Sequence, residues 1–316
     1  MNAPSVATHS LTRKYGSHTA LNGVTLKVDP GSVYALVGPN GAGKTTLIQL
    51  LMNLQPATSG AAELLGMPSR QIRGAALNHV GYVSGSQSMP DWMTVRAMLD
   101  YLRPFYPTWD RLLEAQLMRD FGLSPKPKLK QLSRGMKTKV AFIGALSYRP
   151  ALLVLDEPFT GLDPLTRDEL IQGLLERIGE TTLFLSSHDL AEIESLASHV
   201  GYLEEGSLLF SEEMTTLSNR FRKIEFAVDP ASMPPPTLPP EWMEFERAGS
   251  LVRFTHSQFA TEEETQAQIE RLLPTAGEVA FSPMSLRSIF LTSARAHRSG
   301  RAQFDAAAGS ISGGKA

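Results

Sequence analysis

The sequence predicts an α/β fold with a mixed β-sheet, followed by a smaller α+β domain. Two observations predict the α/β part. The strand-like run 33–37 leads through a glycine-rich loop into the helix-like run 47–52. The apolar run 152–155 has the composition of a parallel strand buried on both faces, and two carboxylates follow it directly. A change of composition after residues 204–206 and the proline-rich segment 230–240 predict the second domain.

The glycine-rich loop has the composition of a phosphate-binding site. Its nine residues are Gly38, Pro39, Asn40, Gly41, Ala42, Gly43, Lys44, Thr45 and Thr46. Glycines let successive backbone N–H groups turn inward around a polyphosphate, and the N-terminus of the next helix adds positive potential. In this pattern Lys44 reaches the β- and γ-phosphates and Thr45 ligates Mg²⁺. The loop therefore predicts nucleotide binding, and a plain turn between a strand and a helix is the structural alternative.

Two carboxylates follow the second strand. Because open α/β sheets bind ligands at the carboxyl ends of their strands, Asp156 and Glu157 are expected to meet the loop that carries Lys44. Asp156 is the candidate for holding Mg²⁺ through water. Glu157 is the candidate general base, which polarises the water that attacks the γ-phosphate. An isolated Asp-Glu pair would be better explained as an acidic turn, so this interpretation depends on the phosphate loop.

A segment between these two motifs carries a family resemblance. Its residues are Leu132, Ser133, Arg134, Gly135, Met136 and Lys137, ahead of the helix-like stretch 138–147. With the phosphate loop, it resembles the nucleotide-binding subunit of ABC transporters, whose signature is Leu-Ser-Gly-Gly-Gln; this chain differs at Arg134 and Met136. In that family the signature contacts the γ-phosphate bound by the opposite subunit, so the resemblance implies that Ser133, Arg134 and Gly135 act across a dimer. Taken alone, Ser133 fits a helix N-cap.

Three further positions match the family in sequence order. Tyr15 resembles the aromatic residue that stacks on adenine, Asp163 resembles the polar contact of the loop that links the two sites of the dimer, and His188 resembles the switch histidine that reaches the γ-phosphate. Each has a structural alternative, namely a packing tyrosine, a turn at 161–164 and a structural histidine. The order of the whole set favours the functional interpretation.

A further position, outside the signature, departs from the family pattern. After a strand like 81–84, the family usually has a glutamine or glutamate that joins the magnesium site to the membrane partner, whereas this chain has Gly85. Gln87 follows two residues later. We therefore hypothesise that Gln87 serves as the magnesium ligand of this loop, or that water completes the magnesium coordination there.

The resemblance covers approximately residues 6 to 210. It implies a P-loop NTPase core of the ABC type within residues 1–215, with a helical subdomain at about 89–147. Among the members of the family, bacterial ABC-2-type exporters are the most similar, because the chain has a single nucleotide-binding unit and a C-terminal appendage.

The resemblance also implies an activity and partners. The activity is Mg²⁺-dependent ATP hydrolysis, with Glu157, His188 and Lys44 as the catalytic residues. The implied partners are a multi-span membrane permease on a separate chain and a second ATPase subunit, in a homodimer or a heterodimer that ATP closes head to tail. The chain would then be a peripheral subunit on the cytoplasmic side of the cell membrane.

The composition agrees with this interpretation. The formal net charge of −2 predicts no global attraction to nucleic acid or anionic lipid, so no nucleic-acid partner is expected. The absence of cysteine excludes disulfides and cysteine-ligated zinc, which fits a reducing cytoplasm. No uninterrupted apolar stretch approaches the roughly 20 residues that span a bilayer, and residues 1–10 lack the features of a secretory signal. Transport would therefore need another, membrane-spanning chain.

The predicted helical subdomain is rich in aromatic residues, namely Trp92, Tyr101, Phe105, Tyr106, Trp109 and Phe121. Most of them are expected in the core. Trp92 lies beside the loop that carries Gln87, and it is the candidate for contact with a cytoplasmic helix of the membrane partner, because large aromatic residues are favoured anchors at interfaces.

The second domain is predicted at 216–296, with strand-like runs and a capped amphipathic helix at 261–273. No cluster of polar or charged residues stands out, so a stabilising or dimer-supporting role is expected rather than a regulatory ligand site. Residues 297–316 are rich in Ala, Gly and Ser and are predicted to be disordered.

Two other classes of protein share parts of this pattern. A soluble ATPase of this family that acts on ribosomes would be expected to carry two nucleotide units, and one that acts on chromosomes would carry a long coiled coil between its phosphate motifs. Neither feature occurs in the sequence, although a soluble ATPase with a ribosome or nucleic acid as its partner stays as the alternative. A scaffold that does not hydrolyse ATP is disfavoured by the presence of Glu157 and His188.

Overall fold

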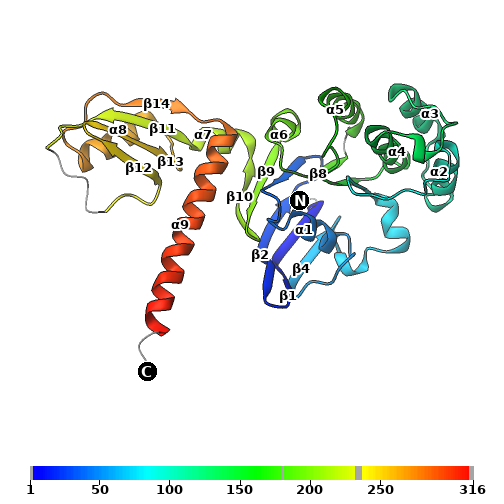
Figure 1. Ribbon diagram of the computed structural model, residues 1–316, viewed down its shortest axis with the longest axis horizontal. Helices are drawn as coiled ribbons and strands as arrows, with labels where there is room; N and C mark the ends of the chain where they lie inside the picture. The colour runs from blue at the N-terminus through cyan, green and yellow to red at the C-terminus, as the bar shows by residue number, and fades with distance from the viewer. Residues whose placement is uncertain (1–2, 180, 232–236, 313–316) are drawn as a thin grey trace. The chain divides into compact units, whose positions relative to one another are not determined.

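The computed structural model describes residues 3–179, 181–231 and 237–312 (Figure 1). The chain divides into two compact units, with the boundary between Ser211 and Glu212. The sequence predicted this boundary after residue 215. Residues 232–236, in the proline-rich segment, lie outside the described residues.

The first unit begins with a small antiparallel sheet in the order β2-β1-β4-β5. Its strands are β1 Val6–Tyr15, β2 His18–Val28, β4 Ser59–Leu64 and β5 Met67–Pro68. Strands β1 and β2 form a hairpin, whose turn contains Gly16 at a φ of 59°. Glycine adopts this left-handed conformation without the steric cost of a side chain.

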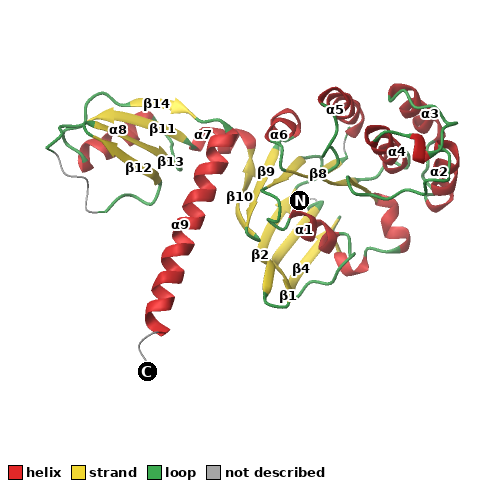
Figure 2. Ribbon diagram, in the orientation of Figure 1, coloured by secondary structure: helices red, strands yellow, loops and turns green. Residues whose placement is uncertain are grey.

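A six-stranded sheet in the order β10-β9-β3-β8-β7-β6 forms the centre of the first unit (Figure 2). Its strands are β3 Val33–Val37, β6 Val80–Ser84, β7 Leu152–Asp156, β8 Thr182–Ser187, β9 His199–Glu204 and β10 Ser207–Glu213. Strands β9, β3, β8, β7 and β6 run parallel, and every residue of β7 and β8 is buried. This order places the carboxyl ends of β3, β8 and β7 next to one another, and the predicted site follows those ends.

The described part of the first unit contains six α-helices and four short 3-10 helices. The α-helices are α1 Lys44–Leu51, α2 Val95–Leu102, α3 Arg111–Asp120, α4 Arg134–Leu146, α5 Pro164–Ile178 and α6 Leu190–Leu196. The 3-10 helices are η1 Ser69–Gln71, η2 Gly74–His79, η3 Arg103–Phe105 and η4 Leu129–Gln131. Helices α2 and α3 both contact α4, and the three form the helical region of the unit.

Buried Glu114 connects the elements of this helical region. Its carboxylate accepts hydrogen bonds from Arg96 Nη1 at 2.6 Å, Arg103 Nη2 at 2.9 Å and Trp109 Nε1 at 2.8 Å. Burial raises the pKa of Glu114, but these hydrogen bonds outweigh it, so the pKa lies below its ordinary value. The carboxylate therefore stays ionised, and its hydrogen bonds connect α3 to α2 and to the segment between these two helices.

The aromatic residues of this region are less buried than predicted. Phe121 is in the core, Tyr106 and Trp109 are at its edge, and Trp92, Tyr101 and Phe105 are exposed. The expectation that most of them lie in the core is therefore wrong. The reason is that α2 packs inward through Val95, Met98 and Leu99, so that helical periodicity leaves Tyr101 on its outer side.

The second unit is an antiparallel sheet in the order β12-β13-β11-β14, with helices. Its strands are β11 Arg222–Ala227, β12 Trp242–Ala248, β13 Leu251–His256 and β14 Ala280–Pro283, and its first two helices are α7 Met214–Arg220 and α8 Glu262–Leu272. Helix α8 is the capped helix that the sequence predicted, since Thr261 Oγ1 accepts a hydrogen bond from the N–H of Glu264 at 3.2 Å. The core of this unit consists of Ile224, Phe226, Val228, Trp242, Val252, Phe254, Ile269 and Leu273.

The end of the described chain is helical. Helix α9 Leu286–Ser312 includes residues 297–312, where the sequence predicted disorder, and residues 313–316 lie outside the described residues. The alanine residues that suggested a disordered tail are also the strongest helix formers, and here they continue a helix that packing has started. In the first part of α9, Thr292 Oγ1 donates a hydrogen bond to Glu244 Oε2 at 2.7 Å, which fixes the helix to β12. In the part of the chain described, no helix combines the length and apolarity needed to cross a membrane.

Candidate active site

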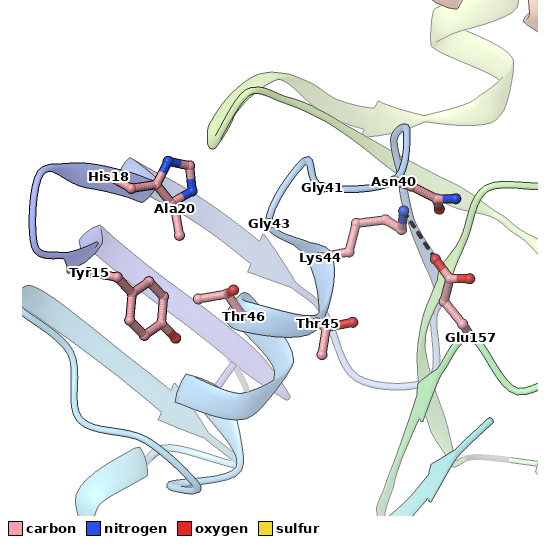
Figure 3. A pocket seen from close by; sticks show the side chains of 10 residues that line it. All are labelled: Tyr15, His18, Ala20, Asn40, Gly41, Gly43, Lys44, Thr45, Thr46 and Glu157. Atoms are coloured by element: carbon pink, nitrogen blue, oxygen red, sulfur yellow. Dashed lines mark ion pairs between the residues drawn. The ribbon is translucent and has the colours of Figure 1, made fainter. Parts of the chain in front are cut away.

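The glycine-rich loop borders a cavity of about 400 Å³ (Figure 3). The cavity is lined by Tyr15, His18, Ala20, Asn40, Gly41, Gly43, Lys44, Thr45, Thr46 and Glu157. Gly41 has a φ of 83° and Gly43 a φ of 106°, and a Cβ added at Gly43 would lie 2.5 Å from the carbonyl oxygen of Ala20. The loop can therefore follow this path only with glycine at position 43.

Lys44 is held inside the loop. Its side chain is 4% exposed, and Nζ donates hydrogen bonds to the carbonyl oxygens of Gly38 at 2.7 Å and Pro39 at 3.1 Å. Nζ also forms an ion pair with Glu157 Oε1 at 3.1 Å, which Figure 3 marks. Because an ammonium group has three donors, a phosphate oxygen that binds Lys44 must replace or share one of these partners.

Glu157 lies directly after β7, and its carboxylate meets two further side chains. Oε2 accepts a hydrogen bond from Thr160 Oγ1 at 2.9 Å and lies 2.8 Å from Nδ1 of His188, which follows β8. Burial raises the pKa of Glu157, but the hydrogen bonds from Thr160 and Lys44 and the nearby positive charge outweigh it, and the pKa lies below its ordinary value. The carboxylate is therefore ionised at neutral pH and able to accept a proton.

Asp156 and Thr45 form an oxygen pair beside this carboxylate. Thr45 Oγ1 donates to Asp156 Oδ1 at 3.1 Å, and Ser186 Oγ donates to the same oxygen at 2.8 Å. Burial raises the pKa of Asp156 above its ordinary value, and the two hydrogen bonds oppose this rise. A positive ion at this place would stabilise the buried carboxylate.

The donor set fits Mg²⁺. Mg²⁺ prefers oxygen ligands and is usually held by one or two protein side chains together with water and substrate phosphates. Thr45 and Asp156 supply two such oxygens next to the phosphate loop. The described residues contain no group of three or more His, Cys, Asp or Glu side chains that would form an all-protein cage.

Tyr15 lines the same cavity at its outer end. It is 41% exposed, its hydroxyl is hydrogen-bonded to Gln55 Oε1, and the guanidinium of Arg13 lies 4.4 Å from the ring centroid. An exposed ring held in a fixed orientation at the edge of a phosphate cavity is suited to stacking on a nucleotide base.

Ser133, Gly135 and Asp163 lie at the starts of α4 and α5. Ser133 Oγ accepts a hydrogen bond from the N–H of Met136 at 3.2 Å, and Asp163 Oδ1 accepts one from the N–H of Thr166 at 3.0 Å. A Cβ at Gly135 would lie 2.7 Å from Cγ2 of Thr166, so any larger residue there would require the Thr166 side chain to move. Ser133 is thus the N-cap of α4. This structural role is compatible with a contact across a dimer.

Neither Gln87 nor Asp156 lines the phosphate cavity, but Asp156 is joined to the lining residue Thr45 by a hydrogen bond of 3.1 Å. Gln87 is placed differently. It lines a second cavity of about 510 Å³, together with residues such as Tyr82, Met98 and Tyr148. We therefore expect Gln87→Ala to leave kcat and its Mg²⁺ dependence within about twofold of the wild type. Phosphate release measured over a range of Mg²⁺ concentrations checks this, with Thr45→Ala as the comparison that removes an expected ligand. A higher Mg²⁺ requirement in Gln87→Ala would indicate that Gln87 ligates Mg²⁺.

The sequence interpretation missed Thr160 and Ser186. Ser186 touches both carboxylate residues, because its hydroxyl also accepts a hydrogen bond from the N–H of Glu157 at 3.0 Å. Its position at the carboxyl end of β8, two residues before His188, is a signal that could have identified it. Thr160 has no such signal beyond its distance of three residues from Glu157.

The comparisons with known proteins agree with this geometry. The family model described as ABC transporter matches residues 21–160. The ABC transporter ATP-binding protein YtrB of Bacillus subtilis (strain 168) is 29% identical over 221 residues, which are 69% of this chain and 75% of YtrB. The bacitracin transport ATP-binding protein BcrA of Bacillus licheniformis is 33% identical over 226 residues, which are 70% of this chain and 74% of BcrA. Among solved structures, an ATP binding subunit of an ABC transporter matches this chain with a TM-score of 0.61 at 26% sequence identity. The match covers 67% of this chain and 91% of the solved chain. The chain therefore belongs to the ABC transporter family, among its ATP-binding proteins.

Proposed function

We propose that this chain binds and hydrolyses Mg-ATP and thereby powers a membrane transport complex. The observation that carries the proposal is the position of the Glu157 carboxylate, which meets Lys44 and His188 beside the phosphate loop. A general base, a phosphate-binding cation and a second polar group at one place are what phosphoryl transfer to water requires.

The proposed reaction transfers the γ-phosphoryl group of ATP to water. The water oxygen bonds to the γ-phosphorus, the bond from the γ-phosphorus to the oxygen that bridges to the β-phosphorus breaks, and Glu157 accepts the proton that the water loses. Lys44 and the loop amides stabilise the charge on the phosphate oxygens, and His188 contacts the γ-phosphate. When bound by Thr45 and Asp156, Mg²⁺ would neutralise charge on the β- and γ-phosphates.

A second ATPase subunit is part of the proposal. We assign Ser133, Gly135 and Asp163 to contacts with ATP, or with the phosphate loop, of that subunit. Ser133 and Asp163 are exposed in the single chain, which supports this assignment. Arg134 contacts Gly85 of its own chain, so we do not assign it to the second subunit. The second subunit would be another copy of this chain or a related ATPase.

The transport partner is proposed to be a multi-span permease on a separate chain, with this subunit bound at the cytoplasmic face of the membrane. The name of BcrA concerns bacitracin transport, which supports a transport function, and export is the direction that we propose. Trp92 is an exposed aromatic side chain, as are Tyr101 and Phe105, whose rings contact each other, and such side chains are suited to contact with a partner helix.

The test is purification of tagged chain from detergent-solubilised membranes, with the Glu157→Gln variant used to hold the ATP-bound state, followed by mass spectrometry of the co-purifying proteins. A stoichiometric multi-span protein is the expected result. Recovery only from the soluble fraction, with ribosomes, with nucleic acid or alone, would contradict the transport function and favour a soluble ATPase.

We expect Trp92→Ala to weaken assembly with the permease by a factor of about 30 while Mg-ATP affinity is kept. Trp92 is 70% exposed, and truncation of an aromatic interface anchor typically costs about 2 kcal/mol or more. Co-purification at graded detergent and salt measures assembly, and a nucleotide-binding titration of the isolated chain measures affinity. Leu251→Ala, which truncates an exposed apolar residue of β13, is the control. Unchanged recovery of the permease with Trp92→Ala would remove Trp92 from the interface.

A further inference from the structure

Two of the three departures from the family pattern, Gly85 and Arg134, lie against each other in the structure. Gly85 stands where the family has a glutamine or glutamate, and Arg134 stands where the signature has glycine. Nη2 of Arg134 donates a hydrogen bond to the carbonyl oxygen of Gly85 at 3.2 Å. The same guanidinium lies beside Gly161, since a Cβ added there would be 2.7 Å from Nη1 of Arg134. One side chain thus joins the loop after β6 to the turn after β7.

Gly85 rests directly on the peptide that carries Glu157. Its N–H donates to the carbonyl oxygen of Asp156 at 2.9 Å, and a Cβ at position 85 would lie 2.2 Å from the carbonyl oxygen of Glu157. No side chain fits at this place. The absence of glutamine at position 85 is therefore a condition for the close contact between this loop and the Glu157 backbone.

Gly161 belongs to the turn that holds the Glu157 carboxylate. In that turn the N–H of Thr160 donates to the carbonyl oxygen of Glu157 at 3.3 Å, and the Thr160 hydroxyl donates to Glu157 Oε2 at 2.9 Å. Glu157 itself has a φ of 47°, a left-handed conformation that is strained for a residue with a side chain. Such a conformation persists only where surrounding contacts impose it.

We propose that Arg134 is a positioning residue for hydrolysis, which holds Gly85 and the turn at Gly161 in place and so keeps the Glu157 carboxylate oriented. The inference rests on the proposed function, because it takes Glu157 as the general base. Arginine suits the task, since its planar group offers five N–H donors in a fixed geometry and can contact two loops at once.

The test compares steady-state ATP hydrolysis by the wild type, Arg134→Ala, Arg134→Lys and the control Lys137→Ala. Lys137 is on the same helix and is paired with Asp91 at 3.1 Å, so its removal deletes a cation without touching Gly85. We expect Arg134→Ala to lower kcat about five- to tenfold, with KM for ATP changed by less than about twofold, because the residues that bind phosphate are untouched. Arg134→Lys keeps the charge but lacks the planar group, and it should remain well below the wild type. Lys137→Ala should match the wild type.

The split between kcat and KM separates positioning from the loss of a nucleotide contact, because a misplaced Glu157 slows the chemical step and leaves Mg-ATP binding unchanged. Thermal unfolding of Arg134→Ala and Lys137→Ala checks that both variants are folded. A second measurement addresses the opposite subunit. Adding Arg134→Ala to Glu157→Gln should leave Mg-ATP-dependent dimerisation unchanged.

Four outcomes would overturn the inference. They are a wild-type kcat in Arg134→Ala, full activity in Arg134→Lys, a change in KM as large as the fall in kcat, and loss of dimerisation in the double variant. The last result would mean that Arg134 acts on the second subunit. Failure of the proposed function is distinguishable from all four, because the wild type itself would then show no Mg-ATP turnover.

Discussion

Replacing Glu157 with glutamine is expected to lower kcat for ATP hydrolysis by a factor of about 10² to 10⁴ while Mg-ATP binding is kept. Glutamine has nearly the shape of glutamate, so it retains an oxygen that can accept the hydrogen bond from Thr160. It cannot accept the proton of the attacking water. The loss should therefore fall on the chemical step.

The ion pair of Glu157 with Lys44 also determines the Mg-ATP affinity expected of Glu157→Gln. The two groups are 3.1 Å apart in the unliganded site, and the neutral amide no longer competes with phosphate for the ammonium group. Mg-ATP affinity should consequently be equal to or higher than that of the wild type. Calorimetric titration measures the affinity, and single-turnover phosphate release measures the chemical step.

The matched control is Glu169→Gln. Glu169 also pairs with a lysine, Lys139, at 2.8 Å, but the pair lies on α4 and α5 outside the phosphate cavity. The control should keep wild-type turnover. Wild-type hydrolysis by Glu157→Gln would mean that another group takes the proton, and the proposed mechanism would fail.

The pH dependence follows from the sign of the pKa shift. The folded-state pKa of Glu157 is lowered, so its ion pairs and hydrogen bonds contribute stability above the unfolded-state pKa, and this contribution is lost as pH falls through the folded-state pKa. Turnover should decline in the same acidic range, because protonated Glu157 cannot act as a base. In Glu157→Gln this acidic limb should disappear from the residual rate.

The parts of the site that could be predicted from the sequence are those in which one local pattern determines the position. The glycine-rich loop follows β3, Asp156 is the last residue of β7 and Glu157 comes directly after it, and parallel strands bring their carboxyl ends to one edge. The strand order alone is therefore enough to predict that these residues lie close to Lys44. His188 follows the strand between them and meets Glu157 for the same reason.

The features that could not be predicted depend on packing between distant segments. Ser186 touches Asp156 only because β7 and β8 pair with these two residues opposite each other. The contact of Arg134 with Gly85 joins residues 49 positions apart, and neither residue type is unusual in a loop. The exposure of Trp92 likewise depends on which face of the helical region is covered, which hydrophobicity alone does not determine.

Replacing Lys44 with alanine is expected to weaken Mg-ATP binding by a factor of about 10 to 100, since hydrogen bonds to charged groups contribute about 1.5–3 kcal/mol. The ammonium group is almost completely buried, and its partners in the unliganded site are two carbonyl oxygens and Glu157. Among the residues that the structure places in the cavity lining, Lys44 is the only lysine or arginine. Turnover should fall as well, because charge that develops on the phosphate oxygens loses its stabilising partner.

The loss of Lys44 also changes the unliganded protein, and this effect must be separated from binding. Alanine leaves the Glu157 carboxylate without its cation, which raises the pKa of Glu157 toward its ordinary value or above it. Thermal unfolding without nucleotide measures the resulting destabilisation, and the nucleotide-induced rise in Tm then reports binding alone. Lys27→Ala is the control, because it removes a lysine from a surface ion pair with Asp29 at 2.7 Å. If Lys44→Ala folds and its Tm rises with Mg-ATP as the wild type does, Lys44 does not bind phosphate. The loop would then hold nucleotide through its backbone amides alone.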